Sequence, residues 1–201
     1  MKITSLFLLL AMFTLACTNP KNNTNETTSA EYEPSKPMRE APAEHPDYTS
    51  KVPQFTFAST LEEQEEQLKT NPLMLRFQED RKKWAADPHV PLYHFYSPDN
   101  RLNDPNGLSY WQGRWHLFFQ AYPVEDPRQH WGHAVSEDLI HWRDLPFAIY
   151  PNPEYQCFSG SAFVEDDRVI AMYHGTRLGN MVATSSDPLL LNWEKITDGA
   201  P

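Results

Sequence analysis

The sequence reads AVSEDLIHW over residues 134–142 and ATSSDPLLLNW over residues 183–193, and the similarity of these two segments decides the fold. Ala134, Ser136 and Asp138 each recur 49 positions later, and Trp142 recurs 51 positions later. A period near 50 residues that holds about four short strands is typical of one blade of a β-propeller. Two unrelated hairpins could share a Ser-Asp turn and a tryptophan, but the matched spacing favours a repeat.

Runs of aromatic and β-branched residues around these two segments predict the strands of the repeat. Residues 108–111 and 114–120, joined at Gln112-Gly113, are typical of a hairpin, and further strands are expected over 131–136 and 147–150. The pattern restarts with strands over 158–164, 168–173 and 181–185. We therefore predict an all-β fold with about two propeller blades over residues 91–201. Since a propeller closes with about four blades or more, we expect this chain to be the N-terminal fragment of a larger domain.

The first 50 residues are typical of an export signal followed by a tether. Lys2, an apolar run over residues 6–13 and a small residue before Cys17 predict a signal peptide over residues 1–17. The run is shorter than the roughly 20 apolar residues of a membrane span, which argues against a transmembrane anchor. We expect lipidation of Cys17 in an exported bacterial cell-envelope lipoprotein, with plain secretion as the alternative. Residues 18–50, almost without large apolar side chains, are predicted to be a disordered linker.

Residues 51–90 are predicted to be a helical N-terminal extension that packs beside the main domain. Thr60 with Glu63 makes a capping box, and Asn71-Pro72 ends one helix and starts another. In the second helix Met74, Phe77, Arg81 and Trp84 fall along one stripe.

The composition excludes several classes of function. The formal net charge is −10, which argues against nucleic acid and against an anionic membrane surface as partners, because both are bound through clustered Lys and Arg. The eight histidines are scattered without zinc-ligand spacing, so we expect no metal site. No glycine-rich phosphate loop and no nucleophilic Ser or Cys motif occurs. With two cysteines, one of which is expected to be lipidated, no internal disulfide is predicted.

The segment Asn103-Asp104-Pro105-Asn106-Gly107 precedes the first predicted strand. All four of its residue types favour turns, so a plain turn is one interpretation. The other is that Asp104 projects into a central pocket, where a carboxylate could attack the anomeric carbon of a sugar. A retaining glycosidase needs one such carboxylate and a carboxylic acid about 5–5.5 Å away.

Four sequence blocks, taken in order, resemble glycoside hydrolase family 32, which contains invertases, levanases and inulinases. They are YHF with LNDPNGL (residues 93–95 and 102–108), LFFQ with Pro123 (117–120), WGHAVS (131–136) and FSGS (158–161). The resemblance implies a five-bladed β-propeller that hydrolyses β-fructosidic bonds in sucrose, levan or inulin by a retaining mechanism. It implies no cofactor.

The resemblance also implies a role for individual residues. Asp104 matches the nucleophile that forms the covalent fructosyl intermediate. Asn103 and Gln120 match residues that hydrogen-bond the fructosyl unit or the surroundings of the nucleophile. Phe158 and Ser159 match a strip that lines the fructose pocket.

The chain departs from the family pattern in three ways. Arg101 replaces the Trp that is common three residues before the nucleophile. The Arg-Asp-Pro block is absent, and so is the Glu-Cys block that carries the acid/base Glu, since Gln156 precedes Cys157. We expect both blocks beyond Pro201, and we therefore expect this polypeptide alone to be inactive.

Two other functions remain as alternatives at this point. One is a non-catalytic surface protein that binds fructan. The other is a related five-bladed hydrolase of the arabinosidase or xylosidase type. The FSGS block argues against this second alternative.

Overall fold

The structure, a computed structural model, describes residues 46–99 and 101–197. Within these residues two helices come first, α1 (Leu61–Thr70) and α2 (Pro72–Ala85), and eight strands follow. The strands are β1 (Leu102–Trp111), β2 (Arg114–Ala121), β3 (His130–Ser136), β4 (Arg143–Ile149), β5 (Cys157–Val164), β6 (Val169–Gly175), β7 (Gly179–Ser185) and β8 (Glu194–Ile196). Neither helix is long and apolar enough to cross a membrane. The predicted signal peptide, Cys17 and most of the predicted linker lie outside the described residues.

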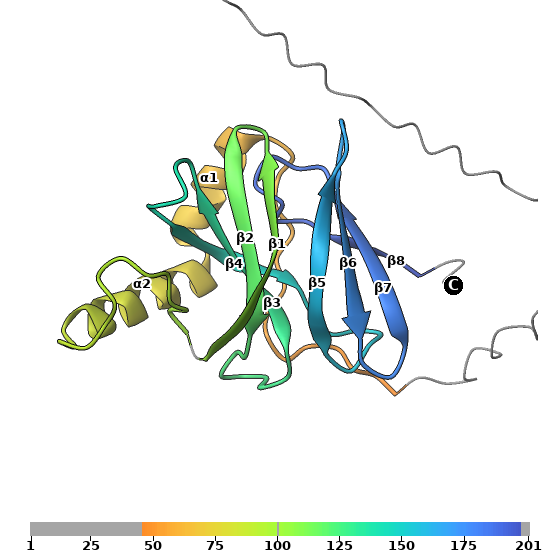
Figure 1. The fold of residues 1–201 in the computed structure, drawn as a ribbon, viewed down its shortest axis with the longest axis horizontal. Coiled ribbons are helices and arrows are strands. Elements are labelled where there is room, and N and C mark those ends of the chain that lie inside the picture. Colours follow the sequence, from red (N-terminus) through yellow and green to blue (C-terminus); the bar gives the residue numbers. More distant parts are fainter. Residues whose placement is uncertain (1–45, 100, 198–201) are drawn as a thin grey trace, which may run out of the picture. The chain divides into compact units, whose positions relative to one another are not determined.

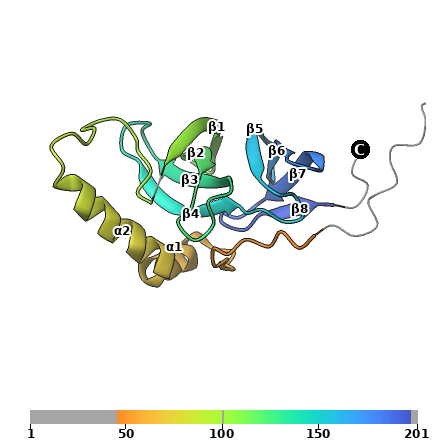
Figure 2. The same cartoon turned by 90° about the horizontal axis from the view of Figure 1, so that it is seen from below.

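The strands form two four-stranded antiparallel sheets, each a meander in chain order (Figure 1). We call β1–β4 blade 1 and β5–β8 blade 2. The first strands of the two sheets, β1 and β5, lie side by side, whereas β4 and β8 form the opposite edges (Figures 1 and 2). The predicted all-β class with two blades is therefore confirmed.

The strand bounds follow the predicted pattern with three differences of more than two residues. Gln112 and Gly113 have φ of 43° and 84°, as the two-residue turn of a tight hairpin requires. However, β1 begins at Leu102 instead of residue 108, and β4 begins at Arg143 instead of residue 147. The short strand β8, which pairs with β7, was not predicted.

The repeated Ser-Asp segments form equivalent corners of the two blades. In blade 1, Asp138 Oδ1 accepts hydrogen bonds from two backbone N–H groups, at Ile140 (2.9 Å) and His141 (2.7 Å). In blade 2, Asp187 accepts in the same way from the N–H groups of Leu191 and Asn192. Each carboxylate thus satisfies the backbone of a tight connection, which explains why Asp recurs at this position.

The two helices cover blade 1 on one side (Figure 2). Thr60 caps α1 as predicted, because its hydroxyl accepts from the Glu63 N–H. The hydroxyl donates in turn to the Glu63 carboxylate, so the side chains of the predicted capping box meet without its second backbone bond. Asn71 ends α1 and caps α2, with Pro72 in the first turn. The Phe77 ring packs edge-on against Phe147 of β4 at 5.7 Å. Trp84 lies at the end of the predicted stripe and is 46% exposed, so the packed stripe ends before it.

Residues 46–59 run without helix or strand along both blades (Figure 2). Ser50, which falls in the predicted linker, lies 2.6 Å from His130 Nε2 of blade 1 through its hydroxyl. Phe57 exchanges two backbone-to-amide hydrogen bonds with Asn192 at the corner of blade 2. Contacts with the sheets therefore begin before residue 51, and the predicted helical extension is helical only from Leu61.

Candidate active site

The backbone of β1 is irregular where the Asn-Asp-Pro-Asn-Gly segment lies. The pairing register with β2 shifts twice, between Leu102 and Pro105 and again between Asn106 and Ser109. Pro105 cannot donate a ladder hydrogen bond, and it is tolerated because β1 is an edge strand of its sheet. Gly107 has φ of 59°, and a Cβ there would lie 2.9 Å from Phe118 Cδ2. The segment is thus a bulged strand and not a simple turn.

Asp104 lies on this bulged segment with an exposed side chain, and neutral donors from both blades hold one of its carboxylate oxygens. Ser159 of β5 donates its hydroxyl to Asp104 Oδ2 at 2.9 Å, and Gln120 Nε2 of β2 donates to the same oxygen at 3.2 Å. Gln120 Nε2 also lies 2.5 Å from Ser159 Oγ. No described residue bonds Asp104 Oδ1. The carboxylate is therefore fixed through one oxygen and has the other available.

The side-chain oxygen of Gln120 accepts hydrogen bonds from Gln129 and Tyr122, two residues that the sequence analysis did not single out. Gln129 Nε2 donates to Gln120 Oε1 at 2.8 Å and to the hydroxyl of Tyr122 at 2.5 Å. Asn103 Nδ2 donates to the same hydroxyl at 3.0 Å. Asn103 is thus tied to the cluster through Tyr122 and not through Asp104.

Two further residues border the cluster. The guanidinium of Arg101, which stands where the family commonly has Trp, lies 4.0 Å from the ring centre of Tyr122. Phe158 is 37% exposed, and its ring lies 5.9 Å from that of His174. The carbonyl oxygen of Phe158 accepts a hydrogen bond from the buried Trp131 indole at 2.9 Å, which joins β5 to β3. Of the five predicted site residues, the structure thus brings Asp104, Gln120 and Ser159 into direct contact, and Asn103 is linked to Gln120 through the Tyr122 hydroxyl.

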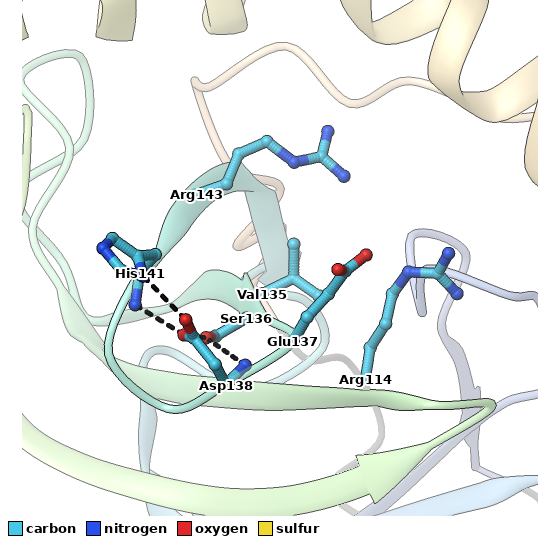
Figure 3. Close-up of a pocket in the computed structure, with 7 residues that line it drawn as sticks. All are labelled: Arg114, Val135, Ser136, Glu137, Asp138, His141 and Arg143. Carbon is cyan, nitrogen blue, oxygen red and sulfur yellow. Dashed lines mark hydrogen bonds and ion pairs between the residues drawn. The ribbon is translucent and has the colours of Figure 1, made fainter.

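A separate cavity of about 280 Å³ lies at the corner of blade 1 (Figure 3). Its lining includes Arg114, Asp138 and Arg143 and none of the Asp104 cluster. The Asp138 carboxylate is bonded there to His141 and Ser136 (Figure 3), and Arg143 is paired with Glu65 of α1. These polar groups hold the corner together, so we assign the candidate active site to the Asp104 cluster.

Buried titratable groups lie elsewhere in the fold. Burial lowers the pKa of His116 and of His130 to about 4 and also lowers that of His133. Burial raises the pKa of the Cys157 thiol, which lies against Glu154. No three His, Cys, Asp or Glu residues in the described part of the chain are placed to hold a metal ion.

The chain is similar to known proteins over the region that contains this cluster. The model of the "Glycosyl hydrolases family 32 N-terminal domain" matches residues 94–198. A levanase of Bacillus subtilis (strain 168) is 41% identical over 109 residues, which are 48% of this chain and 16% of the levanase. A raffinose invertase of Escherichia coli is 44% identical over 89 residues, which are 42% of this chain and 18% of the invertase.

A solved structure agrees with the sequence matches. The sucrose-6-phosphate hydrolase from Lactobacillus gasseri aligns with a TM-score of 0.53 and 28% identity, over 66% of this chain and 29% of that protein. This chain therefore spans less than a third of the relatives that it matches. Because the family model covers just over half of the residues and takes in the whole Asp104 cluster, the chain belongs to glycosyl hydrolase family 32.

Proposed function

We propose that the protein carrying this chain hydrolyses β-fructosidic bonds in sucrose or fructans by a retaining mechanism, with Asp104 as the nucleophile. The observation that carries the proposal is the exposed Asp104 carboxylate, held through Oδ2 by Gln120 and Ser159. A nucleophile fixed in this way loses little further freedom when it reacts.

In the first step Asp104 Oδ1 attacks the anomeric carbon of the fructosyl unit. A C–O bond forms to the carboxylate while the glycosidic C–O bond breaks, and the departing oxygen takes the bonding electrons and a proton from a general acid. In the second step water attacks the same carbon, gives a proton to the general base and releases Asp104. We propose that the acid/base Glu lies in sequence outside these 201 residues.

The neighbours of Asp104 suit these steps. Gln120 and Ser159 donate hydrogen bonds to Oδ2, which fix the position of the carboxylate and leave Oδ1 to attack. We propose that Asn103 and Phe158, at the border of the cluster, contact the fructosyl unit. The pair of carboxylates that this chemistry requires works without a cofactor.

The substrate class is proposed from the relatives. The proteins named levanase and raffinose invertase match the region around Asp104 at 41% and 44% identity. We therefore propose sucrose, levan or inulin as the substrate. An exported cell-envelope protein anchored through a lipidated Cys17 would meet such substrates outside the cell. Incorporation of a labelled fatty acid tests that anchor, and the label should be lost in Cys17→Ser.

The test of the function uses the protein expressed from the complete reading frame that carries these residues. Sucrose, inulin, levan and arabinan are offered separately, and released sugars are quantified. We expect hydrolysis of at least one β-fructoside, loss to background in Asp104→Asn, and normal activity in Asp166→Asn. Asp166 is a matched control because it is exposed in the connection between β5 and β6.

Three results would contradict the proposal. One is hydrolysis of arabinan alone, which would indicate the arabinosidase type. Another is fructan binding without turnover, which would indicate a non-catalytic binding protein. The third is full activity of Asp104→Asn.

A further inference from the structure

The side-chain amide of Gln120 has two ends with opposite hydrogen-bonding character. Its Nε2 faces Asp104 Oδ2 at 3.2 Å and Ser159 Oγ at 2.5 Å, and both contacts need a donor. Rotation of the amide by half a turn would bring Oε1, which only accepts, against the carboxylate. Whatever selects the orientation of this amide therefore decides whether Asp104 is held or repelled.

Two buried neighbours select that orientation. Gln129 Nε2 donates to Gln120 Oε1 at 2.8 Å, and the Tyr122 hydroxyl donates to the same oxygen at 3.4 Å. In the reversed orientation, Gln120 Nε2 would face the Nε2 donor of Gln129. Gln129 Oε1 is buried without a hydrogen-bond partner in the described part of the chain. The direction of the Gln129 amide is therefore set by the acceptors of its Nε2, which are Gln120 Oε1 and the Tyr122 hydroxyl.

Gln129 is fixed in turn by blade 2. Its N–H donates to Gln156 Oε1 at 3.2 Å, and its carbonyl accepts from the N–H of Cys157 at 2.9 Å. Gln120, Tyr122 and Gln129 are 6%, 8% and 9% exposed, respectively. Water competes little for hydrogen bonds at such positions, so their directions persist.

We propose that Gln129 and Tyr122 are positioning residues, which lock the Gln120 amide with its donor toward Asp104 and couple the nucleophile to the contact between blades 1 and 2. The proposal rests on the function proposed above. Both residues bond Gln120 Oε1 and act on Asp104 through Gln120.

The first test measures steady-state hydrolysis by the protein from the complete reading frame. Gln129→Met keeps the length of the side chain and removes both donors, and Tyr122→Phe removes only the hydroxyl. For each variant we expect kcat to fall about tenfold while KM stays within about twofold, as when an interaction used in the transition state is weakened. The matched controls are Gln78→Met on the exposed face of α2 and Tyr110→Phe, whose ring is 52% exposed, and both should keep normal kcat.

A double-mutant comparison separates positioning from a general loss of folding. In a Gln120→Met background, Gln129→Met should cause no further fall in kcat, because it acts only through the amide that is already absent. A second tenfold loss in that background would overturn the proposal, and so would normal kcat in both Gln129→Met and Tyr122→Phe.

A measurement without substrate tests the positioning role of Gln129 even if the protein does not hydrolyse fructosides. The side-chain NH₂ of Gln120, assigned by NMR with ¹⁵N-labelled glutamine, should exchange slowly with solvent in the wild type. It should exchange faster in Gln129→Met than in the wild type and stay slow in Gln78→Met. Unchanged exchange in Gln129→Met would refute the positioning role, whereas a wild type without hydrolysis refutes only the proposed function.

Discussion

Lowering the pH from 8 to 5 should remove about 4 kcal/mol or more from the free energy of unfolding, because blade 1 buries neutral histidines. His116 and His130 are each 0% exposed, and burial holds the pKa of both at about 4, against 6.5 for the free side chain. His133, which lies 2.9 Å from His116 through their ring nitrogens, has a lowered pKa for the same reason.

The sign and size of the effect follow from these pKa values. As the pH falls below 6.5, these histidines bind protons in the unfolded chain but stay neutral in the folded chain. Their contribution to the free energy of unfolding is therefore complete above pH 6.5 and is lost as the pH falls toward 4. For a pKa that moves from 6.5 to about 4, the loss at pH 5 is about 2 kcal/mol for each histidine. Burial raises the pKa of Asp126, but its hydrogen bonds to Arg128 and Lys51 together outweigh burial and lower the pKa to about 2. Its contribution to stability is therefore lost only below pH 3.8. Asp99, with a pKa raised by burial, offsets part of the loss as it takes up a proton.

Urea unfolding followed by tryptophan fluorescence at pH 8, 6.5 and 5 measures the effect. His130→Gln should reduce the difference between pH 8 and pH 5 by about 2 kcal/mol, and His89→Gln, at an exposed position, should leave it unchanged. A free energy of unfolding that is constant within about 1 kcal/mol from pH 8 to pH 5 would refute the reasoning, since it would mean that the imidazoles are hydrated or charged in the fold.

Two further substitutions test the packing of blade 2 in the same unfolding assay. Lys195→Met should destabilise by about 3–5 kcal/mol, because it removes the ammonium that bonds the fully buried Glu154 carboxylate at 2.5 Å. Lys69→Met, at an exposed ion pair, should cost much less, and equal costs would contradict the account. Gly160→Ala should cost more than about 3 kcal/mol, since its Cβ would lie 2.1 Å from the carbonyl oxygen of Met172. Gly113→Ala meets open space and strains only a positive φ, so it should cost about 1 kcal/mol, and the reverse order of the two costs would contradict the packing.

Features with a local cause could be predicted from the sequence. The hairpin turn at Gln112-Gly113 and the cap at Thr60 depend on residues within a few positions of each other, and both occur where they were predicted. The two blades were predicted because the corner residues Asp138 and Asp187 recur at a fixed interval. Each caps its own connection, so the same local chemistry produces the same corner twice.

The start of β1 could not be predicted from local sequence. Asn-Asp-Pro-Asn-Gly favours a turn in isolation, and only the pairing with β2 draws it into a strand with two register shifts. The positive φ of Gly107 beside Phe118 lets the strand bulge there. Long-range pairing thus overrides local preference at the segment that carries Asp104.

The cluster itself was predicted in part. The family resemblance singled out Asp104, Gln120 and Ser159, which meet although Ser159 lies 55 positions beyond Asp104. It did not single out Gln129 or Tyr122, because an isolated Gln or Tyr carries no recognisable pattern. Gln129 is placed by Gln156 and Cys157 of the neighbouring blade, and that contact exists only after the two blades pack.

The central claim, that Asp104 becomes covalently linked to fructose, can be tested by trapping the intermediate. The protein from the complete reading frame is mixed with saturating substrate, quenched in acid during turnover, digested and examined by mass spectrometry. The account predicts a peptide containing Asp104 that carries one fructosyl residue, absent without substrate and absent in Asp104→Asn. Turnover without any fructosyl adduct, or an adduct on a different carboxylate, would contradict it.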